Sequence, residues 1–288
     1  MRGVSVVLAA AFFISLTNVL APIVYESGSN ALTYQALRFL FFVAICRLWL
    51  WARGLSPALP PRRRFTAYGA GAAYALGAGS LLASLAYIPV SMAVLILYFY
   101  PLLTMIATCA LDRRPPKAIE VLCLLAAFMG LALALGATFD NLHPTGLGLA
   151  ALSSFGIATF VVWSGRSLAD LDSTITTFHM ATSALILTSA ATLASGSFTL
   201  EISSAFGWLI LGAAVLCFTV AFFAIFSGVR LVGPVRFAML MNTEPVITIA
   251  LSIVILSESL TAWQFTGAAL VISAVYAAQR FGGVVEGT

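Results

Sequence analysis

The stretch MNTEPVITIALSIVILSESLTAWQFTGAALVISAVY, residues 241–276, decides the fold. It contains two long apolar runs that are separated by a short link carrying Glu258. A helix needs about 20 mostly apolar residues to cross a bilayer. Long apolar runs without alternating polarity favour helices over the strands of a β-barrel. The stretch therefore predicts two transmembrane helices.

The same pattern extends over the whole chain of 288 residues. Hydrophobic residues make up 61% of it and charged residues 8%, whereas a soluble domain carries roughly 25% charge. So few charges cannot cover a water-facing surface, and the chain is expected to lie in a lipid bilayer. Ten segments are predicted to span it: 4–25, 31–51, 66–86, 89–110, 118–138, 145–165, 174–194, 205–228, 234–256 and 260–279. The first run is longer than a signal-peptide core and is interpreted as an uncleaved span.

Basic residues lie on one side of these spans. Twelve of the fourteen lie at the N-terminus, after even-numbered spans or beyond the last span, and the other two, Arg38 and Arg47, lie within span 2. The links after odd-numbered spans hold no Lys or Arg and carry the acidic residues Glu26, Asp140, Glu201 and Glu258. The positive-inside rule therefore predicts a multi-pass protein of the cell (inner) membrane with both termini cytoplasmic. The net charge of +4 is interpreted as an orientation signal, so no nucleic-acid partner is expected.

The chain also carries the signs of an internal repeat. Tyr100-Pro101 and Glu244-Pro245 each lie near the middle of a span, and the two prolines are 144 residues apart, half the chain length. The same offset aligns Thr104 with Thr248. Because each half contains an odd number of spans, the second half must enter from the opposite side. The prediction is an inverted repeat of residues 1–140 and 141–288, typical of secondary transporters.

Residues 241–276 resemble the end of an EamA repeat, with Glu-Pro in mid-span, an acidic residue after an aliphatic run, Leu-Thr and a glycine-containing last helix. The stretch LILYFYPLLTMIATCALDRRPPKAIEVLCLLAAFMGLAL, residues 95–133, resembles the first copy, although Tyr100 and Arg114 replace its acidic residues. Nearly the whole chain resembles two EamA-like repeats of the drug/metabolite transporter superfamily, and it is most similar to aromatic amino acid exporters.

This resemblance implies an all-α integral membrane fold of ten helices around a central cavity. It also implies alternating access and the export of amino acids with aromatic or large neutral side chains, without a cofactor. Export of other drugs or metabolites is the alternative. An intramembrane enzyme or a non-transporting scaffold is more remote, because the sequence has two histidines, no H-E-x-x-H or G-x-S-x-G motif and no large soluble domain. The absence of a G-x-x-x-x-G-K-[ST] motif argues against ATP hydrolysis.

Polar groups in the hydrocarbon core are costly and therefore indicate a transport pathway. Glu244 is the first candidate, as a proton-carrying or amine-binding carboxylate; the alternative is a carboxylate paired within the bundle. Arg38 is expected to meet a substrate carboxylate or to form a structural pair. Pro101 and Pro245 are predicted to bend their helices, because proline lacks an N–H donor.

The remaining candidates are hydrogen-bonding and aromatic residues within the spans. Only one of Tyr98 and Tyr100 is expected to face the cavity, because residues two apart on a helix point about 200° apart. For every candidate the competing interpretation is packing within the bundle. The four cysteines lie in apolar runs without metal-ligand spacing, so no metal site is expected. The other predicted cavity residues are Asn18, Tyr74, Ser80, Phe155, Trp163, His179 and Asn242.

Overall fold

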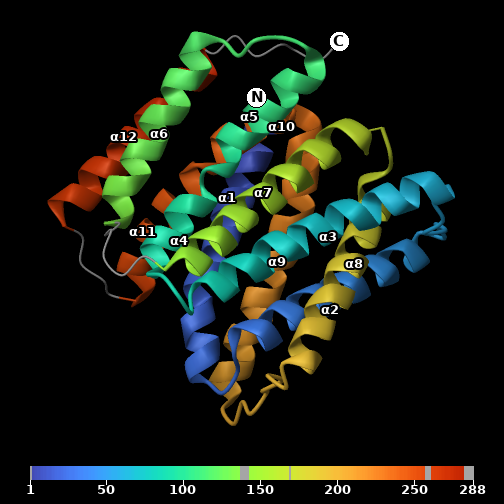
Figure 1. Ribbon diagram of the computed structural model, residues 1–288. Coiled ribbons are helices and arrows are strands. Elements are labelled where there is room, and N and C mark those ends of the chain that lie inside the picture. Colours follow the sequence, from blue (N-terminus) through green and yellow to red (C-terminus); the bar gives the residue numbers. More distant parts are fainter. Residues whose placement is uncertain (1, 137–142, 169, 257–260, 282–288) are drawn as a thin grey trace.

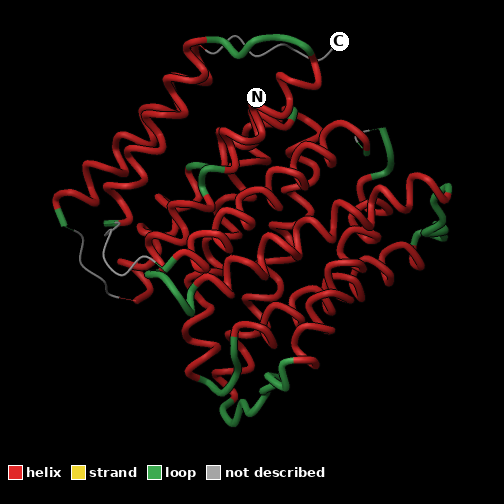
Figure 2. The backbone as a smooth tube through the Cα atoms, viewed as in Figure 1, coloured by secondary structure: helices red, strands yellow, loops and turns green. Residues whose placement is uncertain are grey.

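The computed structural model describes residues 2–136, 143–168, 170–256 and 261–281. Within these ranges the fold is all-helical, with one isolated β-bridge between Ser29 and Leu200 (Figures 1 and 2). The helices are α1 (Arg2–Glu26), α2 (Ala31–Ala52), α3 (Pro61–Ser84), α4 (Val90–Leu97), α5 (Tyr100–Asp112), α6 (Ala118–Leu135), α7 (Pro144–Ser167), α8 (Ser173–Ala194), α9 (Ala205–Val232), α10 (Pro234–Met241), α11 (Thr243–Leu256) and α12 (Ala262–Phe281).

Eight helical segments in the described ranges are long and apolar enough to cross a membrane. In this count α4 with α5, and α10 with α11, each form one segment. The two predicted spans that do not qualify correspond to α3 and α12. Helix α3 is rich in glycine and alanine and begins with three arginines, and α12 carries Gln264 and Gln279. Composition lowers the mean hydropathy of both helices, although both are as long as a span.

The helices pack mainly across the two halves of the chain. Helix α1 lies along α9, α3 along α7, and α6 along α12 at one edge of the molecule (Figure 1). Small residues allow the closest approaches: a Cβ atom on Gly71 would lie 2.0 Å from the carbonyl oxygen of Met180, and one on Gly267 would lie 2.4 Å from the carbonyl oxygen of Gly130. Such backbone proximity is the usual way in which helices associate in lipid.

An aromatic cluster fills the centre between α2, α3, α7 and α9. Phe39 packs edge to face on Phe218 and Phe222, with ring centroids 5.2 and 5.6 Å apart. Phe42 packs on Phe222 at 5.1 Å in the same manner, which is the preferred arrangement of aromatic pairs. These buried rings join α2 to α9 in the core of the bundle.

Two of the predicted spans are each divided into two shorter helices. Helix α4 ends at Leu97 and α5 begins at Tyr100, whereas α10 ends at Met241 and α11 begins at Thr243. Each interruption lies about one turn before Pro101 or Pro245. A proline cannot donate the hydrogen bond to the residue four positions earlier, and its ring clashes with that carbonyl. The two interruptions are therefore consequences of the two prolines and share their spacing in the sequence.

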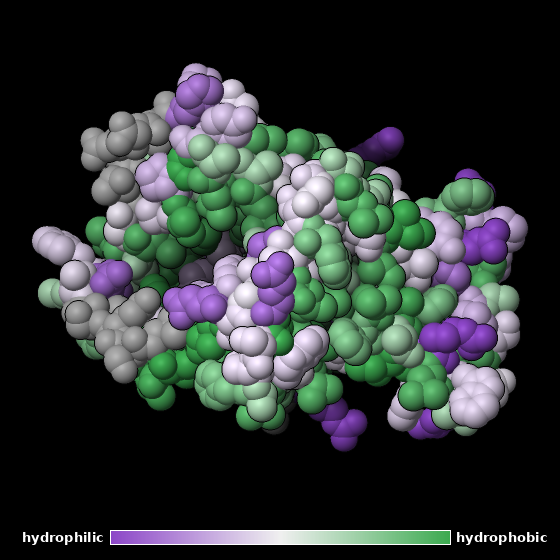
Figure 3. Space-filling view, turned by 90° about the horizontal axis from the view of Figure 1, so that it is seen from below, coloured by the Kyte–Doolittle hydropathy of each residue, from purple (hydrophilic) through white to green (hydrophobic). Residues whose placement is uncertain are grey.

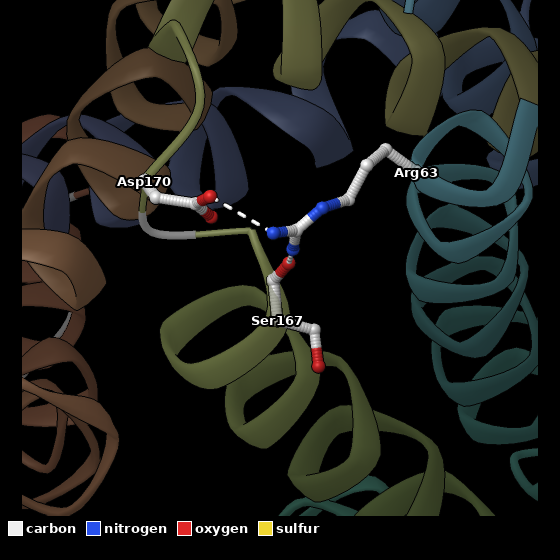
Figure 4. Close-up of polar contacts among 3 residues, drawn as sticks. All are labelled: Arg63, Ser167 and Asp170. Atoms are coloured by element: carbon white, nitrogen blue, oxygen red, sulfur yellow. Dashed lines mark hydrogen bonds and ion pairs between the residues drawn. The ribbon is translucent and has the colours of Figure 1, made fainter. Parts of the chain in front are cut away.

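Polar contacts tie the links together at both ends of the bundle. At the basic end, the Arg63 guanidinium donates to Asp170 over 2.9 Å and to the carbonyl of Ser167 (Figure 4). Arg166 likewise donates to Asp112 over 2.6 Å. At the opposite end, the α1–α2 and α8–α9 connections are joined by the β-bridge and by a 2.8 Å bond from the Glu201 amide to the Gly28 carbonyl. Asp140, Glu258 and the predicted boundary between residues 140 and 141 lie outside the described residues.

Candidate functional site

A cavity of about 400 Å³ lies between the two halves of the chain. Its walls include the second half of α1, the first half of α2, the second half of α3 and the middle of α7, together with the interruptions of the α4–α5 and α10–α11 segments. These halves of α1, α2 and α3 are the ones nearer to the links without Lys or Arg. The face that carries the α1–α2 and α8–α9 connections is hollowed (Figure 3). The cavity therefore lies toward the side that is poor in basic residues.

Arg38 supplies the positive charge in the cavity wall. Its guanidinium carbon lies 4.5 Å from the ring centroid of Tyr34 and 4.7 Å from that of Phe218, and it donates a hydrogen bond to the side chain of Gln35. Its Nε atom is buried and has no hydrogen-bond partner. No acidic side chain among the described residues forms an ion pair with it. A charge held in this way is unfavourable unless an anion compensates it, so Arg38 is suited to bind an anionic ligand group.

Glu244 supplies the carboxyl group of the same cavity. It lies in the first turn of α11, directly after the interruption at Asn242. The Asn18 amide donates to its Oε1 atom over 3.2 Å, and the Tyr98 hydroxyl interacts with the same carboxyl. The hydroxyl of Ser15 donates to the Glu244 backbone carbonyl over 2.9 Å, which fixes this turn against α1. Arg38 and Glu244 line one cavity without forming an ion pair with each other.

Tyr98 and Tyr100 both line the cavity, so the expectation that only one of them would do so is wrong. Their ring centroids are 6.0 Å apart. The expectation assumed a continuous helix, but the regular α-helix ends at Leu97 and begins again at Tyr100, so the regular rotation per residue does not apply there. Tyr74 also lines the cavity, and its ring packs edge to face on Phe160 at 5.2 Å.

Three of the predicted cavity residues lie elsewhere on α3 and α7. Phe155 is 63% exposed on the outer surface of the bundle. Trp163 is 43% exposed and packs over Gly69, where an added Cβ would lie 2.7 Å from its ring. Ser80 is buried but is not among the residues that line the cavity. Both α3 and α7 are apolar on most sides, so their sequences did not indicate which face turns inward.

His179 and Asn242 make structural contacts outside the cavity lining. The Nε2 atom of His179 lies 2.7 Å from the carbonyl oxygen of Pro57, and its Nδ1 atom lies 3.3 Å from the Tyr68 hydroxyl. This histidine therefore ties α8 to the α2–α3 link. The Asn242 amide donates to carbonyls of the preceding turn, 3.3 Å away for Met239, and so compensates the interrupted helix.

The cavity also contains residues that the sequence analysis did not select. Gln35 lies one turn before Arg38 on α2, and this pair of polar residues in one span was a visible signal. Ser153 lines the cavity with a buried hydroxyl that has no partner. Aromatic and aliphatic lining residues gave no signal, because such residues are common on every face of a membrane helix; among them are Tyr25, Tyr34, Phe160, Phe237 and Met241.

No metal centre accompanies this cavity in the described part of the chain. No group of three His, Cys, Asp or Glu side chains is placed to hold an ion there. The four cysteines are free, and Cys46 and Cys123 are buried.

Comparison with known proteins identifies the architecture. The model of the EamA-like transporter family matches residues 1–136 and 144–278, which are two copies of the repeat. A solved structure titled only "Crystal structure of protein" superposes with a TM-score of 0.75 at 19% identity, over 95% of this chain and 97% of that one. No curated protein matches. The chain belongs to the EamA-like transporter family of the drug/metabolite transporter superfamily and is a multi-pass membrane transporter.

Proposed function

We propose that this EamA-like transporter exports amino acids with aromatic or large neutral side chains. The observation that carries the proposal is the pairing of an uncompensated guanidinium, Arg38, with a separate carboxyl group, Glu244, in one cavity. An amino acid is a zwitterion with one group of each charge on the same carbon. Its carboxylate would accept hydrogen bonds from Arg38, and its ammonium group would donate to Glu244.

The rest of the cavity wall suits the side chain of such a substrate. Tyr74, Tyr98, Tyr100 and Phe160 present aromatic rings, and a cavity of about 400 Å³ is within the range of roughly 300–1,000 Å³ typical of small-molecule sites. Aromatic rings favour flat or bulky apolar groups and interact well with other rings. Small polar solutes would leave the apolar space between these rings empty.

We also propose that the chain crosses the membrane ten times as two inverted five-helix repeats, with both termini cytoplasmic. In such a repeat α1 corresponds to α7, and α3 corresponds to α9. The α1–α9 pair is therefore equivalent to the α7–α3 pair, and both pairs pack along each other extensively. The helix interruptions at Tyr98 and Asn242 are related by the same exchange. The one-sided distribution of basic residues supports this orientation.

In this orientation the cavity opens outward, and the contacts of Arg63 and Arg166 hold the cytoplasmic end closed. Alternating access would open that end and close the outer one around the same residues. Because Arg38 belongs to the first half and Glu244 to the second, a relative movement of the halves would change the distance between the two charged groups.

Proton coupling through Glu244 is part of the proposal. A carboxyl group binds either a proton or the ammonium group of a substrate, but not both at once. Alternating access would then carry substrate in one direction and protons in the other. The contacts from Asn18 and Tyr98 keep this carboxyl in place in both states.

Counterflow uptake by the purified, reconstituted protein tests the substrate class. Proteoliposomes are loaded with unlabelled amino acid and presented with labelled compounds of three kinds: aromatic or large aliphatic amino acids, the corresponding decarboxylated amines, and the corresponding acids without the amine. We expect only the amino acids to accumulate. If no amino acid exchanges, the proposed substrate class is wrong; exchange of the amines instead would favour the alternative, export of other drugs or metabolites.

A further inference from the structure

A second cavity lies on the outer surface of the bundle, away from the transport cavity. It is a groove of about 400 Å³ between α3 and α8, which pack along each other. Its lining is apolar almost throughout, and Phe65 and Ile186 are 69% and 61% exposed at its rim. In a membrane-spanning bundle this surface faces the hydrocarbon of the bilayer.

Small residues on α3 create the groove. Gly69 and Ala72 form its α3 wall, and an added Cβ at Gly69 would lie 2.7 Å from the ring of Trp163. The small side chain of Ala72 leaves space beside α8, whereas the missing Cβ of Gly69 lets the Trp163 ring of α7 approach α3. On α8 the groove is bordered by Ser183, whose hydroxyl donates to the Tyr68 carbonyl over 2.9 Å, so no free polar group interrupts it there.

The groove leads to arginines at one end. Arg62, Phe65, Gly69 and Ala72 follow the three- and four-residue spacing of one helix face, so Arg62 continues the groove-lining stripe into the first turn of α3. Arg64 lies one turn before Tyr68, another lining residue. At 1.5 Å per residue, Arg62 and Ala72 are about 15 Å apart along the helix, half of the roughly 30 Å hydrocarbon thickness. The groove thus spans about one leaflet.

These two arginines differ from their neighbour Arg63. Arg63 is engaged by Asp170 and the Ser167 carbonyl (Figure 4). Among the described residues, the exposed side chains of Arg62 and Arg64 have no hydrogen-bond or ion-pair partner. The nearby Asp172 is occupied as the N-cap of α8, where it accepts the Thr174 and Ile175 amides. Asp170 and Asp172 therefore already have partners of their own.

We propose that the groove between α3 and α8 binds an anionic phospholipid, with an acyl chain along Phe65, Gly69 and Ala72 and the phosphate on Arg62 and Arg64. An acyl chain matches an apolar groove one leaflet long, and the lipid phosphate matches two arginines without acidic partners at its end. Basic pockets between transmembrane helices recognise anionic headgroups in this way. The site is separate from the transport cavity, so the proposal does not depend on the identity of the substrate.

Native mass spectrometry of the purified full chain tests the site. The protein is equilibrated with equal amounts of phosphatidylglycerol and phosphatidylcholine that carry the same acyl chains, and the lipids that it retains are compared. The wild type is expected to retain phosphatidylglycerol preferentially. Each arginine near an anionic lipid contributes about 1 kcal/mol, so R62Q/R64Q is expected to lower this preference on the order of thirtyfold. R62K/R64K keeps both charges and should keep most of it.

Two further variants separate a built site from general surface attraction. R280Q removes an exposed arginine at the end of α12, away from the groove, and is expected to leave the preference unchanged. Ala72→Phe fills the groove and is expected to lower the retention of both lipids. The proposal is overturned if R62Q/R64Q keeps the wild-type preference, if R280Q lowers it as much, or if Ala72→Phe has no effect on retention. A melting curve of each variant identifies loss of fold.

Discussion

Replacing Arg38 by methionine should weaken substrate binding without lowering the thermal stability of the protein. The methionine side chain is unbranched and long enough to occupy the space between the rings of Tyr34 and Phe218, which lie 4.5 and 4.7 Å from the guanidinium carbon. The replacement removes the only positive charge among the residues that line the transport cavity. It therefore removes the proposed partner of the substrate carboxylate and changes little else.

The size of the effect follows from the contacts of Arg38. Hydrogen bonds to a charged group contribute roughly 1.5–3 kcal/mol, so affinity for an amino acid should fall about tenfold to a hundredfold. The two cation–π contacts contribute roughly 0.5–1 kcal/mol each, and their loss opposes the relief of a buried charge whose Nε atom has no partner. The melting temperature should therefore stay the same or rise.

The assay is equilibrium binding of an aromatic amino acid and of its decarboxylated amine to the detergent-solubilised protein. R38M should weaken binding of the amino acid and leave that of the amine unchanged, because the amine lacks the group that Arg38 contacts. R47M is the matched control, since Arg47 is an exposed arginine of the same helix outside the cavity. An unchanged affinity of R38M for the amino acid, or an equal loss for both ligands, would refute the assignment of Arg38.

Three further outcomes are expected. Glu244→Gln should abolish substrate-driven proton movement in proteoliposomes that contain a pH-sensitive dye, while the protein stays folded; persistent proton movement would exclude Glu244 as the carrier. Gly71→Ala should lower the melting temperature, because its Cβ would lie 2.0 Å from a backbone carbonyl of α8 and overpacking costs roughly 1–3 kcal/mol. Gly79→Ala, whose Cβ meets nothing within 4 Å, should not lower it, and equal effects would contradict this packing. Arg63→Gln should raise the rate of hydrogen exchange in the α7–α8 link about two- to fivefold, as expected for loss of an exposed ion pair of roughly 0.5–1 kcal/mol. The same rise in Arg280→Gln would show that the Arg63–Asp170 ion pair does not hold this link.

The helices were predictable because each depends on its own residues. The span predicted at 205–228 corresponds to α9, and that predicted at 174–194 corresponds to α8. Pro101 and Pro245 predicted the positions of the two helix interruptions, because a proline removes the hydrogen bond to the carbonyl one turn earlier in the helix. The sequence predicts the start of the third span at residue 66, whereas α3 begins at Pro61, because a proline followed by three arginines is as typical of a link as of the first turn of a helix.

The cavity was only partly predictable. Arg38 and Glu244 stood out because a charged residue within a span needs a specific environment. Phe155 and Trp163 did not have to face inward, because an aromatic ring is as favourable against lipid as against another helix. Tyr98 and Tyr100 both reach the cavity at a place where the regular helix is interrupted, between α4 and α5.

The sequence by itself determined that this chain lies in a membrane, where its apolar helices are, how its basic residues are distributed and where two of its helices break. These properties follow from transfer of side chains into lipid and from local backbone chemistry, which act over a few residues. Only the tertiary structure decided which face of each helix turns inward, that Arg38 and Glu244 share one cavity without pairing, and that a groove remains beside Gly69. These features depend on the rotation of each helix about its own axis, which is set by close contacts such as Gly71 against α8, between residues far apart in the chain.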